Sequence, residues 1–248
     1  MKASPKRHLP SLVTALNLFA GFLSVISSIR GDYMEAASLI VVAAIMDVLD
    51  GKVARLTKSS SEFGVELDSL ADVSSFGFAP AVLIYRAYFE PWGIWGILIS
   101  FTPLVFGGIR LARFNVGVAD HAEKDSYFTG LPIPSSAITI ASFVAFEMDV
   151  FQACNHIFVM AIVTLLVSFL MVSKIRYEGM PNFSFRKTED RIKLGLLIVC
   201  FIAFLIYPQR VAFPVMILFI AYGILMGILA IFSNKESDDD TQDIPAID

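Results

Sequence analysis

Residues 46–77 read MDVLDGKVARLTKSSSEFGVELDSLADVSSFG, and this stretch places four aspartates in a mostly apolar part of the chain. Asp47 and Asp50 are three residues apart, and Asp68 and Asp72 are four apart, so each pair shares one face of a helix. The first pair lies near the end of an apolar segment, and the second pair opens the next one. Two such helices joined by a short connection run antiparallel, so we expect the four carboxylates to meet at one end of the pair.

The composition of the whole chain indicates a membrane protein. Of the 248 residues, 56% are apolar and 17% are charged, whereas soluble domains carry roughly 25% charged residues. The mean hydropathy is +0.70. A net charge of −4 disfavours nucleic acid as a partner. The apolar residues form long blocks instead of alternating, so we predict an all-α polytopic membrane protein and not a strand barrel.

Eight apolar segments are candidates for crossing a bilayer, which takes about 20 residues in a helix. We expect the catalytic bundle over residues 1–190, an additional transmembrane hairpin over 191–232 and a disordered acidic tail over 233–248. The eight expected spans are 12–29, 36–55, 68–89, 92–113, 132–151, 156–175, 192–207 and 211–232.

The distribution of basic residues predicts the orientation. Sixteen of the 19 Lys and Arg residues fall on one side of these spans, and Arg30, Arg86 and Arg210 fall on the other. Cytoplasmic loops carry the excess of Lys and Arg. We therefore expect a multi-pass protein of the cell membrane, with both termini and the aspartate pairs at the cytoplasmic face.

Four carboxylates at a membrane boundary repel one another and lose hydration, and a hard divalent cation removes both costs. Oxygen ligands without His or Cys favour Mg²⁺, Mn²⁺ or Ca²⁺ over zinc. Such cations commonly take their remaining ligands from substrate phosphates. A single intramembrane aspartate is more often part of an ion relay or a helix–helix contact, but two spaced pairs favour a metal and phosphate site.

The residues between the aspartate pairs suit a phosphate ligand. Gly51 and Ala54 are small and lie on one helix face, which permits close approach. Arg55 is a fixed cation suited to phosphate. Gly64 permits close approach of the backbone, and Ser61 can donate its hydroxyl. We therefore assign all five to the binding of a phosphate-bearing substrate.

The pattern D-x-x-D-G-x-x-A-R, eight residues, G-x-x-x-D-x-x-x-D resembles the signature of the CDP-alcohol phosphotransferase family. The resemblance implies a six-helix bundle, two divalent cations, a CDP-linked lipid or alcohol as donor, and a homodimer. It also implies that Asp47 and Asp68 bridge both metals and that Asp50 holds one. Asp72 holds the other metal and serves as the general base.

Further segments resemble the branch of this family that uses serine as acceptor. In the first span, Thr14 and Asn17 stand where that branch contacts the CDP-lipid. The other three segments are GGIRLARFNV at 107–116, YFTGLPIPSS at 127–136 and MVSKIRY at 171–177. The implied reaction transfers the phosphatidyl group of CDP-diacylglycerol to L-serine, giving phosphatidylserine and CMP.

Basic residues near the same membrane boundary are candidates for binding the serine carboxylate. Arg110 and Arg113 share a helix face, Asn115 follows, and Lys174 and Arg176 end the sixth span. Arginine pairs two carboxylate oxygens at once.

Two other functions stay open from the sequence. One is the same chemistry with glycerol 3-phosphate or inositol phosphate as acceptor, and the other is a cation transporter that uses the carboxylates as an ion path.

Overall fold

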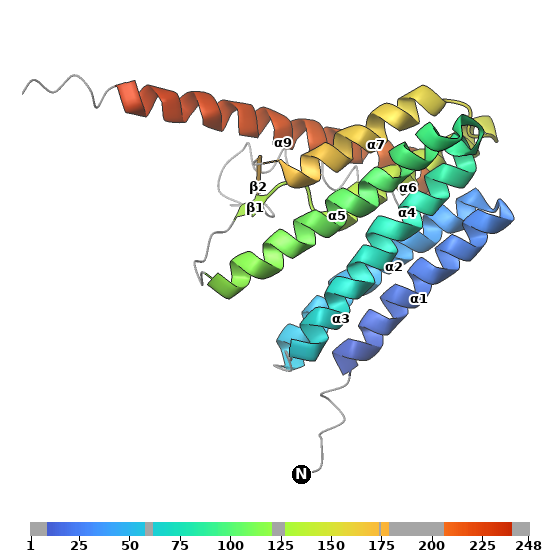
Figure 1. Ribbon diagram of the computed structural model, residues 1–248, viewed down its shortest axis with the longest axis horizontal. Coiled ribbons are helices and arrows are strands. Elements are labelled where there is room, and N and C mark those ends of the chain that lie inside the picture. Colours follow the sequence, from blue (N-terminus) through green and yellow to red (C-terminus); the bar gives the residue numbers. More distant parts are fainter. Residues whose placement is uncertain (1–8, 58–61, 121–126, 174, 179–205, 240–248) are drawn as a thin grey trace, which may run out of the picture.

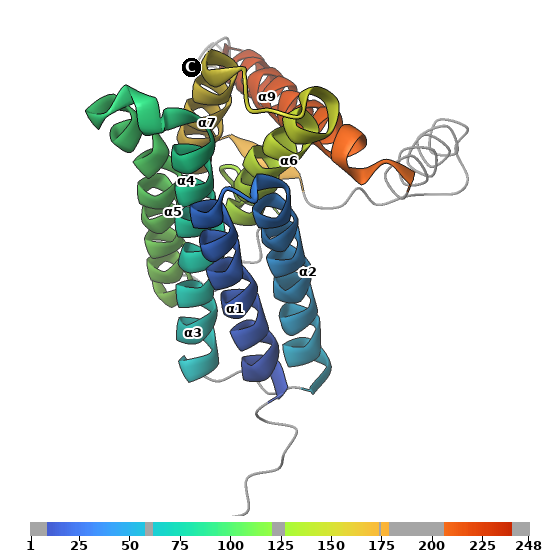
Figure 2. The same ribbon diagram turned by 90° about the vertical axis from the view of Figure 1, so that its right-hand side faces the viewer.

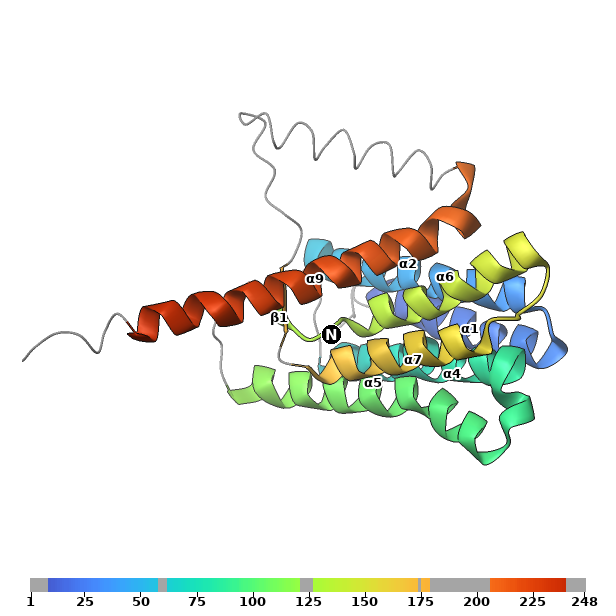
Figure 3. The same cartoon turned by 90° about the horizontal axis from the view of Figure 1, so that it is seen from above.

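The computed structural model describes residues 9–57, 62–120, 127–173, 175–178 and 206–239. Within these ranges the chain is helical except for one short two-stranded ribbon. The long helices lie side by side as a bundle (Figure 1), and the last described helix crosses the bundle obliquely (Figure 3). The all-helical fold predicted from the sequence is thus confirmed.

The first two helices, α1 (Leu9–Arg30) and α2 (Tyr33–Thr57), form a tight antiparallel hairpin. Gly31 has φ +88° at the turn, a backbone conformation that glycine adopts without steric cost. The Ser24 hydroxyl donates to the Ala36 carbonyl at 2.8 Å. The face of α2 within the bundle carries small residues that let the two backbones approach closely; its buried residues include Ala36, Ala37, Ile40, Ala43 and Ala44.

The third span is one continuous helical run that changes its winding four times. Its parts are α3 (Glu62–Asp72), the π-helical η2 (Val73–Phe78), α4 (Ala79–Ile84), the π-helical η3 (Tyr85–Phe89) and the 3₁₀ turn η4 (Glu90–Trp92). The sequence predicts this span at 68–89, but the helix begins at Glu62. The six residues before Asp68 continue the helix because α3 packs against α1. Asp68 therefore lies almost two turns inside the helix instead of at its start.

The second half of the bundle consists of α5 (Ile94–Asp120), α6 (Ile133–Phe151) and α7 (Ile157–Val172). Strands β1 (Tyr127–Thr129) and β2 (Arg176–Glu178) pair antiparallel and so join the segment before α6 to the segment after α7. The last described helix, α9 (Pro208–Asp239), packs against α6 and β2. It covers the expected span 211–232 and runs seven residues into the segment predicted as a tail, because no Gly or Pro interrupts residues 228–239.

Among the described residues, five helical segments are long and apolar enough to cross a membrane, which supports the predicted polytopic membrane protein. These are Pro10–Arg30, Phe63–Trp92, Ile94–Val116, Ile133–Phe151 and Pro208–Gly227. Helix α7 is apolar but shorter, and α2 carries Glu35, Asp47 and Asp50 along an apolar sequence. The expected span at 192–207 falls almost wholly outside the described residues, so the number of eight spans stays a prediction.

The outer surface of the bundle is apolar at helical spacing. On α1, Leu12, Leu16, Phe19 and Phe22 are all exposed, and residues three or four apart lie on one face of a helix. A continuous apolar surface of this kind is rare on soluble monomers. It fits contact with lipid chains.

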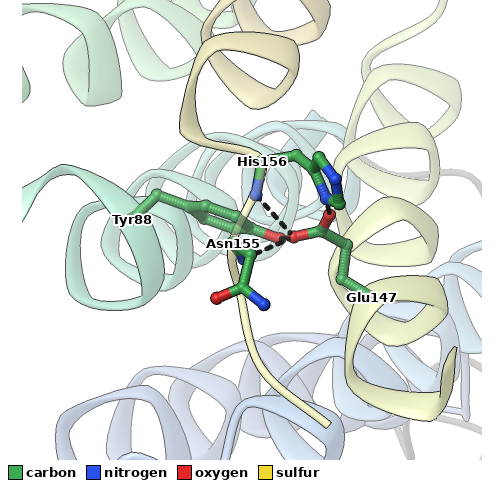
Figure 4. Close-up of polar contacts among 4 residues, drawn as sticks. All are labelled: Tyr88, Glu147, Asn155 and His156. Carbon is green, nitrogen blue, oxygen red and sulfur yellow. Dashed lines mark hydrogen bonds and ion pairs between the residues drawn. The ribbon is translucent and has the colours of Figure 1, made fainter. Parts of the chain in front are cut away.

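A buried carboxylate organises the end of the bundle opposite the aspartate pairs (Figure 4). Glu147 on α6 is 1% exposed. Its Oε2 accepts from the Tyr88 hydroxyl and the Asn155 backbone N–H, both at 3.0 Å, and its Oε1 contacts Nδ1 of His156. Burial raises the pKa of the nearby Cys154 thiol to about 11. The network ties the third span to the turn between α6 and α7.

Replacing Glu147 tests this network. Glu147→Ala leaves the Tyr88 hydroxyl and the Asn155 N–H without their acceptor, so we expect a loss of about 3 kcal/mol in the free energy of unfolding. The matched control is Glu90→Ala, which removes an exposed ion pair with Arg86 and should cost under about 1 kcal/mol. Thermal unfolding in detergent measures both. Equal shifts in Tm for the two variants would contradict a stabilising role for Glu147.

Candidate active site

Three of the four predicted carboxylates meet between α2 and α3. Asp47 and Asp50 come from α2 and Asp68 comes from α3, and one ligand oxygen of each lies within 4.8 Å of the others. Asp72, one turn further along α3, lies close enough for its charge to interact with all three. The C-terminal end of α2 and the N-terminal end of α3 lie at the same end of the bundle, with α1 between them in Figure 2. The structure thus brings the four residues together as the spacing predicts.

These carboxylates lack the partners that buried charges need. Asp50 is 5% exposed. One oxygen each of Asp50, Asp68 and Asp72 is buried and accepts no hydrogen bond within the described part of the chain. Burying an ionised carboxylate without compensation costs several kcal/mol. A divalent cation with a preference for oxygen ligands would satisfy these oxygens and offset the repulsion, so the residues fit such an ion.

Close packing against α1 fixes the helix that carries Asp68 and Asp72. The π-helical η2 begins directly after Asp72, and π-helical turns are frequent at functional sites. The Ser75 hydroxyl of η2 donates to the Asn17 carbonyl at 3.1 Å. A Cβ atom on Gly21 would lie 2.4 Å from the Ser75 Oγ. Only glycine therefore allows α1 and η2 to approach this closely.

Two of the residues predicted to contact the CDP-lipid are buried on α1. Thr14 lies within hydrogen-bonding reach of the Asp50 carboxylate. Asn17 is fully buried, and neither its amide nitrogen nor its amide oxygen has a hydrogen-bond partner within the described residues. A buried amide without partners is costly, so Asn17 has capacity for a polar ligand.

The remaining residues of this predicted set are on or next to α2 and α3. A Cβ atom on Gly51 would meet nothing within 4 Å, so there is open space beside Asp50. The Arg55 side chain is exposed, and its Nε donates to the Gly51 carbonyl at 3.0 Å. Ala54 lies on α2 and Gly64 on α3. Ser61 lies outside the described residues.

The two arginines of α5 take different positions although they are one turn apart. Arg110 is half-buried and lies close enough to Asp72 for their charges to interact, and its Nε has no hydrogen-bond partner within the described ranges. Arg113 is exposed, and its Nη1 donates to the Val172 carbonyl at 3.4 Å. Arg110 thus faces the carboxylates, and Arg113 contacts the end of α7.

A contact that the sequence analysis missed links α5 to α3. The Asn115 side-chain amide donates to the Ser69 hydroxyl at 3.1 Å, and Ser69 stands between Asp68 and Asp72. No spacing rule singles out Ser69, because its partner is 46 residues away. Lys174 lies outside the described residues. Arg176 belongs to β2, where it pairs with Thr129.

Comparison with known proteins gives one family. The family model described as CDP-alcohol phosphatidyltransferase matches residues 7–170. A Helicobacter pylori protein named CDP-diacylglycerol–serine O-phosphatidyltransferase is 36% identical over 244 residues, covering 96% of this chain and 100% of the relative. An archaetidylserine synthase of Methanothermobacter thermautotrophicus is 41% identical over 171 residues, covering 68% of this chain and 69% of the relative. A Mycobacterium bovis protein with the same name as the first is 29% identical over 220 residues, covering 86% and 76%.

Cation binding should be measurable without any substrate. An ion that binds the folded protein alone stabilises it, by about 2.7 kcal/mol at a concentration 100 times the dissociation constant. We expect Mn²⁺ to raise Tm by several degrees and EDTA to reverse the shift. Asp50→Asn should abolish the shift in Tm. The control Asp149→Asn, near the C-terminal end of α6 and away from the aspartate cluster, should leave the shift intact. A Mn²⁺ shift that survives in Asp50→Asn would contradict binding at this site.

Proposed function

Because the chain belongs to the CDP-alcohol phosphatidyltransferase family, we propose that it transfers the phosphatidyl group of CDP-diacylglycerol to the hydroxyl of L-serine. The products are phosphatidylserine and CMP. The observation that carries the chemistry is the cluster of Asp47, Asp50 and Asp68, whose oxygens lie within 4.8 Å of one another. The choice of serine is supported by relatives whose names specify a serine or archaetidylserine product.

The four aspartates would hold two divalent cations, with Mg²⁺ or Mn²⁺ as our candidates and Ca²⁺ as a third. In this assignment, which follows the family signature, Asp47 and Asp68 would help to hold both ions, Asp50 would hold one and Asp72 the other. When bound, the cations supply positive charge that offsets the diphosphate of the donor and the charge that develops on CMP.

Asp72 acts as the general base. A serine hydroxyl is a weak nucleophile at neutral pH unless a positioned carboxylate removes its proton. The hydroxyl oxygen attacks the phosphorus that bears the diacylglycerol, the bond from that phosphorus to the bridging oxygen breaks, and CMP leaves. Asp72 receives the serine proton. Arg110 lies close enough to Asp72 for the two charges to interact.

The donor binds between α1, α2 and α3. Helix α1 adjoins the aspartate cluster and carries the buried amide of Asn17 and the Thr14 hydroxyl. Helix α2 contributes to the cluster and has open space at Gly51. A polar nucleotide suits the unsatisfied Asn17 amide. The proposed CDP-lipid contacts are Thr14, Asn17, Gly51, Ala54, Arg55, Ser61 and Gly64.

The acceptor binds on the side of α5. Arg110 carries a buried Nε without a hydrogen-bond partner among the described residues and lies next to the base, so we place it on the serine carboxylate. Asn115 donates to Ser69 through its amide nitrogen, which leaves its amide oxygen to accept from the serine ammonium. The proposed serine-binding set also includes Arg113, Lys174 and Arg176.

The surroundings follow from the same assignment. We place the protein in the cell membrane, with the active site and both termini at the cytoplasmic face, because the basic residues gather on that side. The resemblance to the family further implies a homodimer. Residues 1–190 form the catalytic bundle, 191–232 an added hairpin and 233–248 an acidic segment. An active site at the membrane boundary reaches both a lipid diphosphate and a water-soluble amino acid.

Acceptor dependence tests the proposed reaction. Purified protein given CDP-diacylglycerol and Mn²⁺ should release CMP when L-serine is added and should form an equimolar amount of phosphatidylserine. Asp72→Asn should reduce the rate by at least about 10³-fold, since the general base is lost. CMP release with glycerol 3-phosphate or inositol phosphate but not serine would contradict the acceptor. Metal flux in liposomes without any CMP would point to the transporter alternative.

The two α5 arginines provide a matched pair for the acceptor site. We expect Arg110→Gln to raise the KM for serine by about tenfold or more, because a charge-assisted contact to the carboxylate is lost. Arg113→Gln should raise it only about twofold to threefold, since Arg113 contacts a backbone carbonyl. Steady-state kinetics with serine as the varied substrate measures both. A larger effect at Arg113 than at Arg110 would reverse this assignment.

A further inference from the structure

The turn that follows α7 is held by contacts from several elements. Within it, the Ser173 hydroxyl donates to the Leu170 carbonyl at 2.8 Å and accepts from the Ile175 N–H at 3.4 Å. The Ile175 carbonyl accepts from the Gly130 N–H at 2.8 Å. Arg113 of α5 contacts the Val172 carbonyl at the start of the turn. These contacts fix the described residues of the turn, Val172, Ser173 and Ile175. Residues 172–176 are here called the acceptor turn.

Helix α9 supports this turn from the side opposite α5. A Cβ atom on Gly227 would lie 2.8 Å from Cγ2 and 3.4 Å from Cγ1 of Ile175. Gly227 is buried, and α9 as a whole contacts β2, the strand that begins at Arg176. The absence of a side chain at Gly227 thus allows α9 to lie directly against Ile175.

The other end of α9 is fixed near the outer end of α6. The Arg210 Nε donates to the Asp149 carboxylate at 2.6 Å, and the rings of Phe213 and Phe143 lie 4.8 Å apart edge to face. Gly227 follows the start of α9 at Pro208 by about 28 Å along a straight helix, close to the thickness of the hydrocarbon core, about 30 Å. The helix is therefore held against α6 near Pro208 and against Ile175 near Gly227.

We propose that α9 positions the acceptor turn and that Gly227 is a positioning residue for serine binding. This inference rests on the proposed function, which assigns Lys174 and Arg176 to the serine site. Helix α9 lies beyond residues 7–170, the part of the chain that the family model matches. The helix would therefore tune acceptor binding from outside the catalytic bundle.

The position of the contact predicts a selective effect. A side chain at position 227 pushes on Ile175, and Ile175 is covalently linked to both proposed serine-binding residues of the turn. Closely packed interiors transmit such displacements instead of absorbing them. The residues proposed to bind CDP-diacylglycerol belong to α1, α2, α3 and the segment between α2 and α3, and none of them belongs to the acceptor turn. Bulk at position 227 should therefore weaken serine binding and spare CDP-diacylglycerol.

The kinetics of Gly227→Val test the proposal. We expect the KM for L-serine to rise by about tenfold, with the KM for CDP-diacylglycerol and the Mn²⁺-induced Tm shift within about twofold of the parent values. Gly227→Ala should give a smaller rise. The double variant Gly227→Val with Ile175→Ala should recover most of the serine KM, because it restores the missing space.

Ala221→Val is the matched control, since it adds comparable bulk on an exposed part of the same helix and should leave the serine KM unchanged. If Gly227→Val does not fold, Ile175→Ala alone tests the same contact and should raise the serine KM. An unchanged serine KM in Gly227→Val or in Ile175→Ala would overturn the proposal, as would equal losses for both substrates. Absence of serine-dependent CMP release by the parent protein would instead overturn the proposed function.

Discussion

The repulsion among carboxylates that lie within 4.8 Å of one another is the constraint on which the rest of the structure depends. Asp47, Asp50 and Asp68 stay together only because α2 and α3 are packed against α1 and cannot separate. The Ser24 hydrogen bond and the small alanines of α2 hold α2 against α1. The contact of Gly21 with Ser75 holds the third span against α1. The packing energy of the bundle thus holds a charge cluster that would be unfavourable without a cation.

The two ends of the bundle each hold buried carboxyl groups, but these groups differ in their hydrogen-bond partners. At one boundary, buried carboxylate oxygens lack hydrogen-bond partners within the described residues and can take a ligand. At the opposite boundary, Glu147 is as deeply buried, but hydrogen bonds from Tyr88, Asn155 and His156 satisfy it. A satisfied carboxylate stabilises the fold, and an unsatisfied one can bind. This difference in partners, and not the presence of buried acids, distinguishes the candidate active site.

Local spacing predicts what lies within one helix or between neighbouring helices, and the fold determines the rest. The intervals between Asp47, Asp50, Asp68 and Asp72 were sufficient to predict that these carboxylates lie close together, because the members of each pair lie on one helix face. The early start of α3 and the π-helical turns depend on packing against α1, which no local pattern reports. The contact of Ser69 with Asn115 joins residues 46 positions apart, and that of Gly227 with Ile175 joins residues still further apart. Neither leaves a periodic signal.

Anomalous diffraction from crystals of the protein grown with Mn²⁺ would show whether the aspartate cluster binds a cation, because it locates the ion without relying on activity. We expect anomalous density between α2 and α3, with carboxylate oxygens of both Asp50 and Asp68 as ligands at about 2.0–2.6 Å, as for hard cations in general. Density that involves the aspartates of one helix alone, or a site elsewhere with these carboxylates unliganded, would contradict it.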